Sequence, residues 1–76
     1  MINEINLNDI FIVKSRSKKG ARAVLLYGIS YKCIDINKNS DCVLLASTKN
    51  EKSKRWVNVY TDECFTILSI NGRELI

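Results

Sequence analysis

Residues 42–70 read CVLLASTKNEKSKRWVNVYTDECFTILSI, and this stretch decides the fold class. It holds three apolar runs, which are separated by the polar segments STKNEKSK and TDE. Runs of about four to eight residues rich in Val, Ile, Tyr, Trp and Thr, bounded by polar clusters, are typical of antiparallel strands. The sequence therefore predicts strands over residues 42–47, 55–60 and 64–70, with a charged hairpin between the first two.

The residues before this stretch extend the same pattern. IFIVK at residues 10–14 predicts a first strand, because most of its positions are β-branched. The segment ARAVLLY at residues 21–27 lies between Gly20 and Gly28, and seven residues are short for a stable helix. We therefore expect a strand there, preceded by a turn. Residues 1–8 are compatible with a strand, a single helical turn or a frayed end.

The segment at residues 29–36 alternates apolar and polar side chains, but its parity changes at Cys33 and Ile34. A shift of one residue sends side chains to the opposite face, so the change predicts a bulge, a bend or a break. NKNSD at residues 37–41 is rich in turn formers. Asn-Gly at residues 71–72 favours a tight turn, which a last short strand or a helical turn could follow.

Length and composition indicate one folded domain over residues 1–76. The chain is 46% hydrophobic and 26% charged, which is ordinary for a globular protein. No apolar stretch approaches the roughly 18 residues that span a bilayer. The N-terminus lacks the basic and long apolar regions of a secretory signal, so we expect a cytoplasmic protein.

The strand spacing suggests a small sandwich or barrel. The pattern resembles SH3-like barrels, a superfold that includes the KOW, Tudor and Sm-type modules. The segments that carry the resemblance are Lys18-Lys19-Gly20, Val43-Leu44-Leu45 and Arg55-Trp56-Val57-Asn58-Val59. The resemblance implies an all-β fold, a small SH3-like barrel of about five antiparallel strands. It does not imply a function, since the superfold serves many.

The cysteines predict no metal centre. There are three of them, none in a CxxC pair, and the chain has no histidine. A structural zinc site would need a carboxylate among its ligands, which is rare. The favoured interpretation is small hydrophobic residues in or near a reduced core, while one disulfide with one free thiol stays open. The cysteines are Cys33, Cys42 and Cys64.

The residue types that catalysis needs are scarce, so we predict a protein that is not an enzyme and holds no cofactor. There is no histidine to act as a base, no G-x-S-x-G motif and no phosphate-binding glycine loop. Four acidic residues could supply carboxylates, but Asp in turns usually caps backbone N–H groups. We interpret these acids as structural: Asp35, Asp41, Asp62 and Glu63.

A first basic cluster lies between the first strand and the segment that follows it. It holds five cations in nine residues without an acid, in a chain with a net charge of +4. A flexible cationic loop can neutralise several phosphates of a nucleic-acid backbone. A solvated turn and a surface for an acidic protein are the alternatives. The cations are Lys14, Arg16, Lys18, Lys19 and Arg22.

A second basic cluster surrounds the tryptophan. Cations beside an aromatic ring suit single-stranded nucleic acid, whose bases stack on rings while lysines hold phosphates. If Val57 and Val59 face the core, Trp56 and Tyr60 face outward; in the opposite register the aromatic rings are buried. Both registers stay open at this point. The cluster comprises Lys49, Lys52, Lys54, Arg55 and Trp56.

These observations favour a binding module that contacts nucleic acid, DNA or RNA, through the 14–22 loop and the 49–56 hairpin. The first alternative is a small phage-type protein that binds and modulates a host protein, with Tyr27, Tyr31 and Trp56 as anchors. Abundant Asn, Ile and Lys, which AT-rich genomes favour, suggest a phage or a low-GC bacterium as the source. The second alternative is a subunit that assembles with copies of itself through a strand edge.

Overall fold

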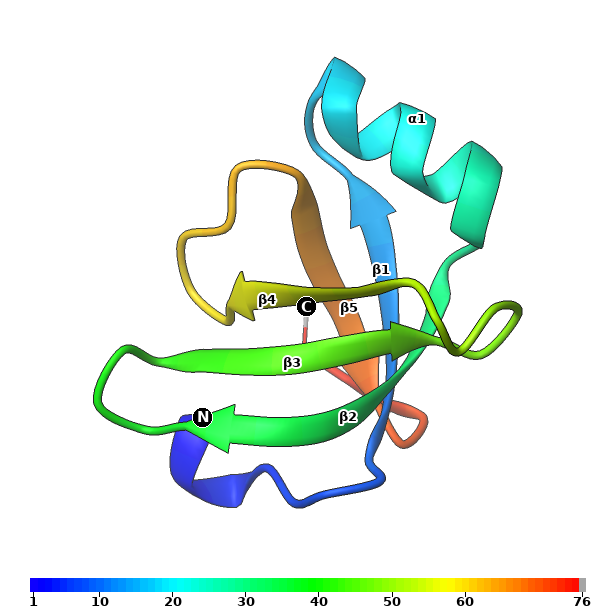
Figure 1. Cartoon of the computed structure of the whole chain (residues 1–76). Coiled ribbons are helices and arrows are strands. Elements are labelled where there is room, and N and C mark those ends of the chain that lie inside the picture. The colour runs from blue at the N-terminus through cyan, green and yellow to red at the C-terminus, as the bar shows by residue number, and fades with distance from the viewer. Residues whose placement is uncertain (76) are drawn as a thin grey trace.

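The computed structural model describes residues 1–75, which form one open antiparallel sheet, one α-helix and one 3-10 turn (Figure 1). The sheet has six strands in the order β4-β3-β2-β1-β5-β6. The fold is therefore mostly β, as expected. In chain order the elements are η1 (Ile2–Glu4), β1 (Ile10–Ser15), α1 (Lys18–Tyr27), β2 (Ser30–Asn37), β3 (Cys42–Ser47), β4 (Lys54–Asn58), β5 (Phe65–Ile70) and β6 (Arg73–Glu74).

The predicted change of parity in β2 is a β-bulge. The pairing of β2 with β3 shifts its register between Cys33 and Asp35. Tyr31 and Cys33 are buried before the shift, and Ile36 packs against the core after it. The extra residue thus keeps the apolar side chains of both halves on the inner face.

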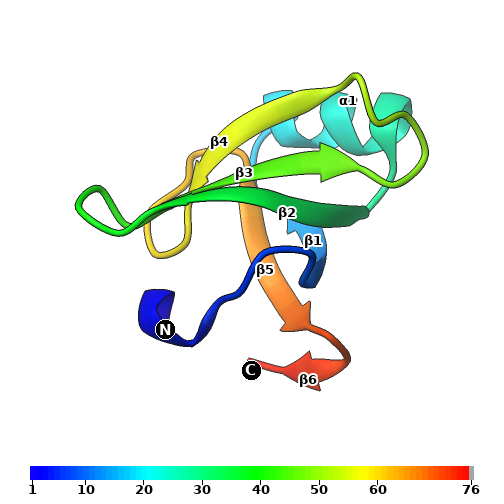
Figure 2. The same cartoon turned by 60° about the horizontal axis from the view of Figure 1, so that its bottom comes forward.

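The core lies between two parts of the same sheet. Figures 1 and 2 show that β2, β3 and β4 cross over β1 and β5, so their inner faces meet. Each strand from β1 to β5 contributes alternate side chains, because successive residues of a strand point to opposite faces. The side chains with almost no exposure are Phe11, Val13, Cys33, Val43, Leu45, Ser47 and Val57.

The expected strand over residues 21–27 is wrong, because Lys18–Tyr27 is an α-helix. Ser17 caps this helix: its hydroxyl accepts a hydrogen bond from the backbone N–H of Gly20 at 3.0 Å. The helix is thus ten residues long and starts before the glycine that the sequence suggests as a turn. The basic stretch at residues 14–22 is consequently a strand end, a short turn and the start of the helix rather than one loop.

Packing against the sheet supports this short helix. Gly20 is its one buried residue, and a Cβ at that position would overlap the carbonyl oxygen of Cys64. Ala23, Val24 and Tyr27 follow on the same face and pack against the core. A helix of this length is marginal alone, so the apolar face that it buries decides its formation.

The turn at residues 71–72 and the free thiols of the cysteines agree with the predictions from the sequence. Asn71 and Gly72 have φ angles of 52° and 81°, as a tight turn between β5 and β6 requires. All three cysteines are free thiols; Cys33 and Cys64 are buried and Cys42 is partly exposed. No helix within residues 1–75 is long and apolar enough to cross a membrane.

Candidate nucleic-acid interface

A groove of about 360 Å³ lies between α1 and the hairpin that joins β3 to β4. In Figures 1 and 2 the C-terminal end of α1 and this hairpin occupy the same side of the molecule. The helix forms one wall and the cationic hairpin forms the other. The groove is lined by Ala23, Tyr27, Tyr31, Lys52, Ser53, Lys54 and Arg55.

A single buried hydroxyl connects the two walls. Ser47 ends β3 and is fully buried; its hydroxyl donates a hydrogen bond to the carbonyl oxygen of Tyr27 at 2.6 Å. The hydroxyl oxygen of Ser47 accepts hydrogen bonds from the backbone N–H groups of Lys49 at 3.1 Å and Asn50 at 3.2 Å. The end of the helix and the start of the hairpin are therefore held at a fixed separation.

The floor of the groove is built on the ring of Phe65. The Tyr31 ring lies 5.7 Å from the Phe65 ring, between centroids, at an angle of 46°. The guanidinium carbon of Arg55 lies 5.1 Å from the same centroid, which is a cation–π distance. The Tyr31 ring and the guanidinium of Arg55 thus share one aromatic neighbour beneath the hairpin.

Two polar atoms of this floor are buried without a hydrogen-bond partner in residues 1–75. They are the hydroxyl of Tyr31, a residue that is only 3% exposed, and Nε of Arg55. A buried polar group left unpaired costs about 1–3 kcal/mol, so native proteins rarely contain one without a reason. Both atoms belong to residues that line the groove.

The phenol of Tyr31 remains a hydrogen-bond donor at neutral pH. Burial raises its pKa above the ordinary value of 10.0, because the charged phenolate is poorly solvated there. The nearby Arg55 cation works in the opposite direction, and Tyr27 raises the pKa slightly further. The site therefore offers a neutral O–H beside a cationic N–H, both suited to an anionic or carbonyl oxygen.

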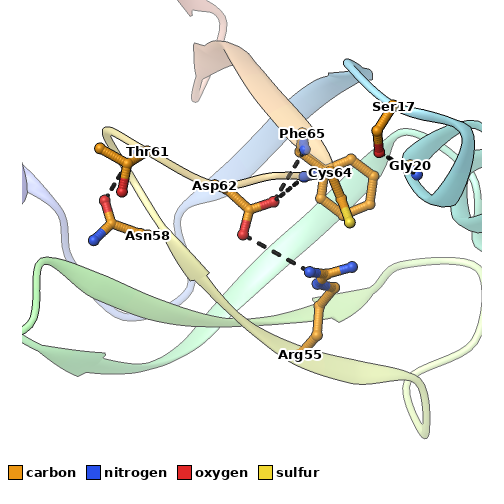
Figure 3. A network of polar contacts seen from close by, with 8 residues as sticks. All are labelled: Ser17, Gly20, Arg55, Asn58, Thr61, Asp62, Cys64 and Phe65. Carbon is orange, nitrogen blue, oxygen red and sulfur yellow. Dashed lines mark hydrogen bonds and ion pairs between the residues drawn. The ribbon is translucent and has the colours of Figure 1, made fainter.

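Asp62 holds the Arg55 side chain in place (Figure 3). One carboxylate oxygen lies 3.7 Å from a terminal nitrogen of Arg55. The other accepts hydrogen bonds from the backbone N–H groups of Cys64 at 2.9 Å and Phe65 at 3.0 Å. Asp62 thus has the structural role that we expect for it, and it also orients the guanidinium for any ligand.

The second basic cluster lies only partly in the groove. Lys52, Lys54 and Arg55 line the groove, whereas Lys49 lies outside its lining. Val57 and Val59 are buried, so the register with inward valines is the correct one. Trp56 is 45% exposed on the face opposite Arg55 and does not line the groove.

The first basic cluster is not a single surface. Lys14 lies at the end of β1 opposite Thr66. Arg16 lies in the following turn and donates its backbone N–H to the carbonyl of Cys64 at 2.9 Å. The remaining three cations, Lys18, Lys19 and Arg22, are exposed on α1 around a small hollow of their own.

The sequence predicts neither aromatic residue of the groove as a nucleic-acid contact. Tyr27 and Tyr31 are expected there only as anchors for a protein partner. Their place in the groove depends on α1, whose best sequence signal is Ser17 three residues before Gly20 as an N-cap.

No protein-family model, no curated protein and no solved structure matches this chain. Residues 1–75 contain no group of three His, Cys, Asp or Glu side chains that could hold a metal ion.

Proposed function

We propose that this protein is a non-catalytic module that binds single-stranded nucleic acid in the groove between α1 and the β3–β4 hairpin. One observation carries the proposal: the buried, unpartnered donors of Tyr31 and Arg55 lie beneath a rim of lysines. Both donors are covered in the unbound protein, so a shift of the Tyr31 or Arg55 side chain on binding would let an oxygen of a phosphate or a base pair with that donor. The lysines would hold the backbone on either side.

The groove has the parts that single-strand binding uses. Lys52 and Lys54 are exposed cations that can neutralise phosphates, with release of counterions as the driving term. Tyr27 is partly buried on the helix wall and offers a ring on which a base can stack. Stacking tolerates any base, so we expect weak preference for sequence.

The size of the groove favours one nucleotide at a time. Pockets for small ligands usually span about 300–1,000 Å³, and this groove of about 360 Å³ lies at the lower end of that range. A duplex would meet only the rim, because its bases are stacked inside and cannot reach Tyr31. A splayed single strand can insert one base or phosphate.

We also infer an SH3-like architecture and a cytoplasmic location. Support for the architecture comes from the strand order, in which β1 pairs with both β2 and β5, and from the bulge that bends β2. Support for the location comes from three free thiols, two of them buried, which suit a reducing compartment.

Fluorescence anisotropy with labelled oligonucleotides tests the proposed function. A single strand of about 12 nucleotides should bind more tightly than the matching duplex, and affinity should fall as salt rises. The double variant Lys52→Glu, Lys54→Glu should lower affinity by at least about tenfold and flatten the salt dependence.

Lys38→Glu is the matched control. Lys38 is exposed in the turn between β2 and β3, at the end of β3 that lies away from the β3–β4 hairpin. It makes the same change of charge and should alter affinity far less. Equal losses in Lys38→Glu and in a single Lys52→Glu variant would contradict a groove-specific site. So would the absence of binding to any single strand at low salt.

A further inference from the structure

One side of α1 carries apolar side chains that are exposed to solvent. Leu25 is 81% exposed and Leu26 is 56% exposed, and Ile29 just after the helix is 47% exposed. Single exposed leucines are common, but two adjacent exposed leucines in the last turn of a helix, followed closely by an exposed isoleucine, make this end of the helix apolar. Leu25 lies on the side of the helix opposite the buried Gly20 and the partly buried Ala23, and Leu26 lies beside it at the edge of that side.

The cationic half of the same face lies one turn earlier. Arg22 precedes Leu25 by three positions and Leu26 by four, which places the three side chains together on the helix surface. Lys18 and Lys19 continue the cationic half, and the segment KKGARAVLLY contains no acid. We define the outer face of α1 by six residues: Lys18, Lys19, Arg22, Leu25, Leu26 and Ile29.

These cations do not serve the helix itself. Lys18 and Lys19 occupy its first turn, where the helix dipole favours acids and disfavours cations. Lys18 and Arg22 form a like-charge pair four residues apart, which weakens a helix further. Contacts with carboxylates from outside the molecule would reverse both effects.

We infer that the outer face of α1 docks a helix from another protein, one with apolar residues at one end and acidic residues at the other. The apolar end would cover Leu25, Leu26 and Ile29. The acidic end would pair with Lys18, Lys19 and Arg22. None of these six residues lines the groove, so the inference does not depend on the proposed function.

Charge and shape favour such a partner over other occupants. Two copies of this face would place the cations of one helix beside the leucines or the cations of the other, with no acid on either helix to pair with them. A helix that lies on a membrane carries a long apolar stripe with cations along its flanks. In α1 the cations occupy the first half of the helix and the exposed leucines the second half. A partner helix with acidic residues in one half and apolar residues in the other would be complementary to this arrangement.

Titration with a pair of synthetic peptides, followed by NMR of the leucine methyl groups, tests the inference. The first is a helical peptide of about 20 residues, long enough to fold, with leucines on one face of its first half and glutamates on the same face of its second half. The second has lysines in place of the glutamates. We expect the glutamate peptide to shift the Leu25 and Leu26 signals and to bind at least about tenfold more tightly.

Variants of exposed residues identify the surface. Arg22→Glu and Leu25→Ser should each weaken binding of the glutamate peptide by about tenfold, since each removes one half of the contact. Lys38→Glu and Leu7→Ser are matched controls at exposed positions elsewhere and should bind as the original protein does. Equal binding of both peptides, or no shift of either leucine, would overturn the inference.

Two further measurements address the other occupants. Cosedimentation with vesicles of phosphatidylcholine and phosphatidylglycerol should show no binding that depends on Leu25. Analytical ultracentrifugation should show no self-association that Leu25→Ser abolishes. A Leu25-dependent signal in either assay would assign the outer face of α1 to a membrane or to a second copy and would refute docking of an acidic helix.

Discussion

The hydroxyl of Ser47 donates a hydrogen bond of 2.6 Å to the carbonyl oxygen of Tyr27, twenty residues away in the chain. This bond joins the last residue of α1 to the last residue of β3. It therefore sets the distance between the helix and the cationic hairpin, and with it the width of the groove. The proposed binding site thus depends on a tertiary contact that holds its two walls together.

Ser47→Ala should loosen the groove. Loss of the hydroxyl leaves the carbonyl of Tyr27 and two hairpin N–H groups without their partner, which costs about 1–3 kcal/mol of unfolding free energy. Urea denaturation measures this loss, and anisotropy should show weaker nucleic-acid binding. Thr48→Val is a control that removes an exposed hydroxyl from the neighbouring residue. A Ser47→Ala variant with unchanged stability would contradict the role that we assign to this bond.

Tyr31→Phe should separate stability from binding. The variant removes a buried hydroxyl that has no partner in residues 1–75, so unfolding free energy should stay the same or rise by up to about 1–2 kcal/mol. Affinity for a single strand should fall, because a donor to the ligand is lost. Comparing urea midpoints with binding isotherms checks both effects. A clear loss of stability would mean that the hydroxyl already has a partner, and the groove would lose one of its two free donors.

Gly20→Ala should destabilise the fold, although the same change usually stabilises a helix by up to about 1 kcal/mol. A Cβ at this position would overlap the backbone of Cys64, which cannot move as a flexible side chain would. We expect a loss of about 1–3 kcal/mol, in the range of overpacked cores. Ala21→Gly on the exposed side of α1 is the control and should cost no more than the propensity difference. A Gly20→Ala variant more stable than the original protein would exclude the close approach of α1 to Cys64.

The sequence predicts the strands well and the site poorly, for physical reasons that differ. Alternating burial along β5 and the bulge near Cys33 are local patterns, so they can be read before the fold is known. The helix depends on the approach of Gly20 to Cys64, a contact between residues far apart in the chain. The helix forms one wall of the groove. The cations of the hairpin can therefore be predicted from the sequence, whereas the presence of tyrosines beside them cannot, because it depends on where the helix packs.

Alkaline pH should weaken the fold. Burial raises the pKa of the Tyr31 phenol and of the Cys33 thiol above their ordinary values of 10.0 and 9.0. Each group is neutral when protonated, so the unfolded chain releases its proton at lower pH than the native protein does. The contribution of these two groups to the unfolding free energy is complete below pH 9.0. It is lost as pH rises through the pKa values of the groups in the unfolded chain and then through their higher pKa values in the native protein. Urea denaturation from neutral pH to well above the ordinary tyrosine pKa of 10.0 measures the decline of the unfolding free energy. Cys33→Ala should move the onset of this decline to higher pH. An unfolding free energy that increased above pH 9.0 would contradict these directions.

Trp56 and Tyr27 give opposite predictions for nucleic-acid binding, although both are aromatic residues near the cationic hairpin. Trp56 is 45% exposed on β4, where Val57 is buried, and it does not line the groove. Tyr27 lines the groove from the helix. Tyr27→Ala should therefore lower single-strand affinity by about 1–3 kcal/mol, the usual contribution of one stacked base.

Trp56→Ala should leave that affinity within about twofold, which is less than the loss of a stacked base. Anisotropy titrations of the two variants under the same salt conditions make the comparison, and circular dichroism checks that each is folded. Tyr27 packs partly against the core, so Tyr27→Phe supplies a version that keeps the ring and the packing and should bind almost normally. The opposite order, with Trp56→Ala the weaker binder, would place the nucleic acid on the outer face of β4 and remove it from the groove.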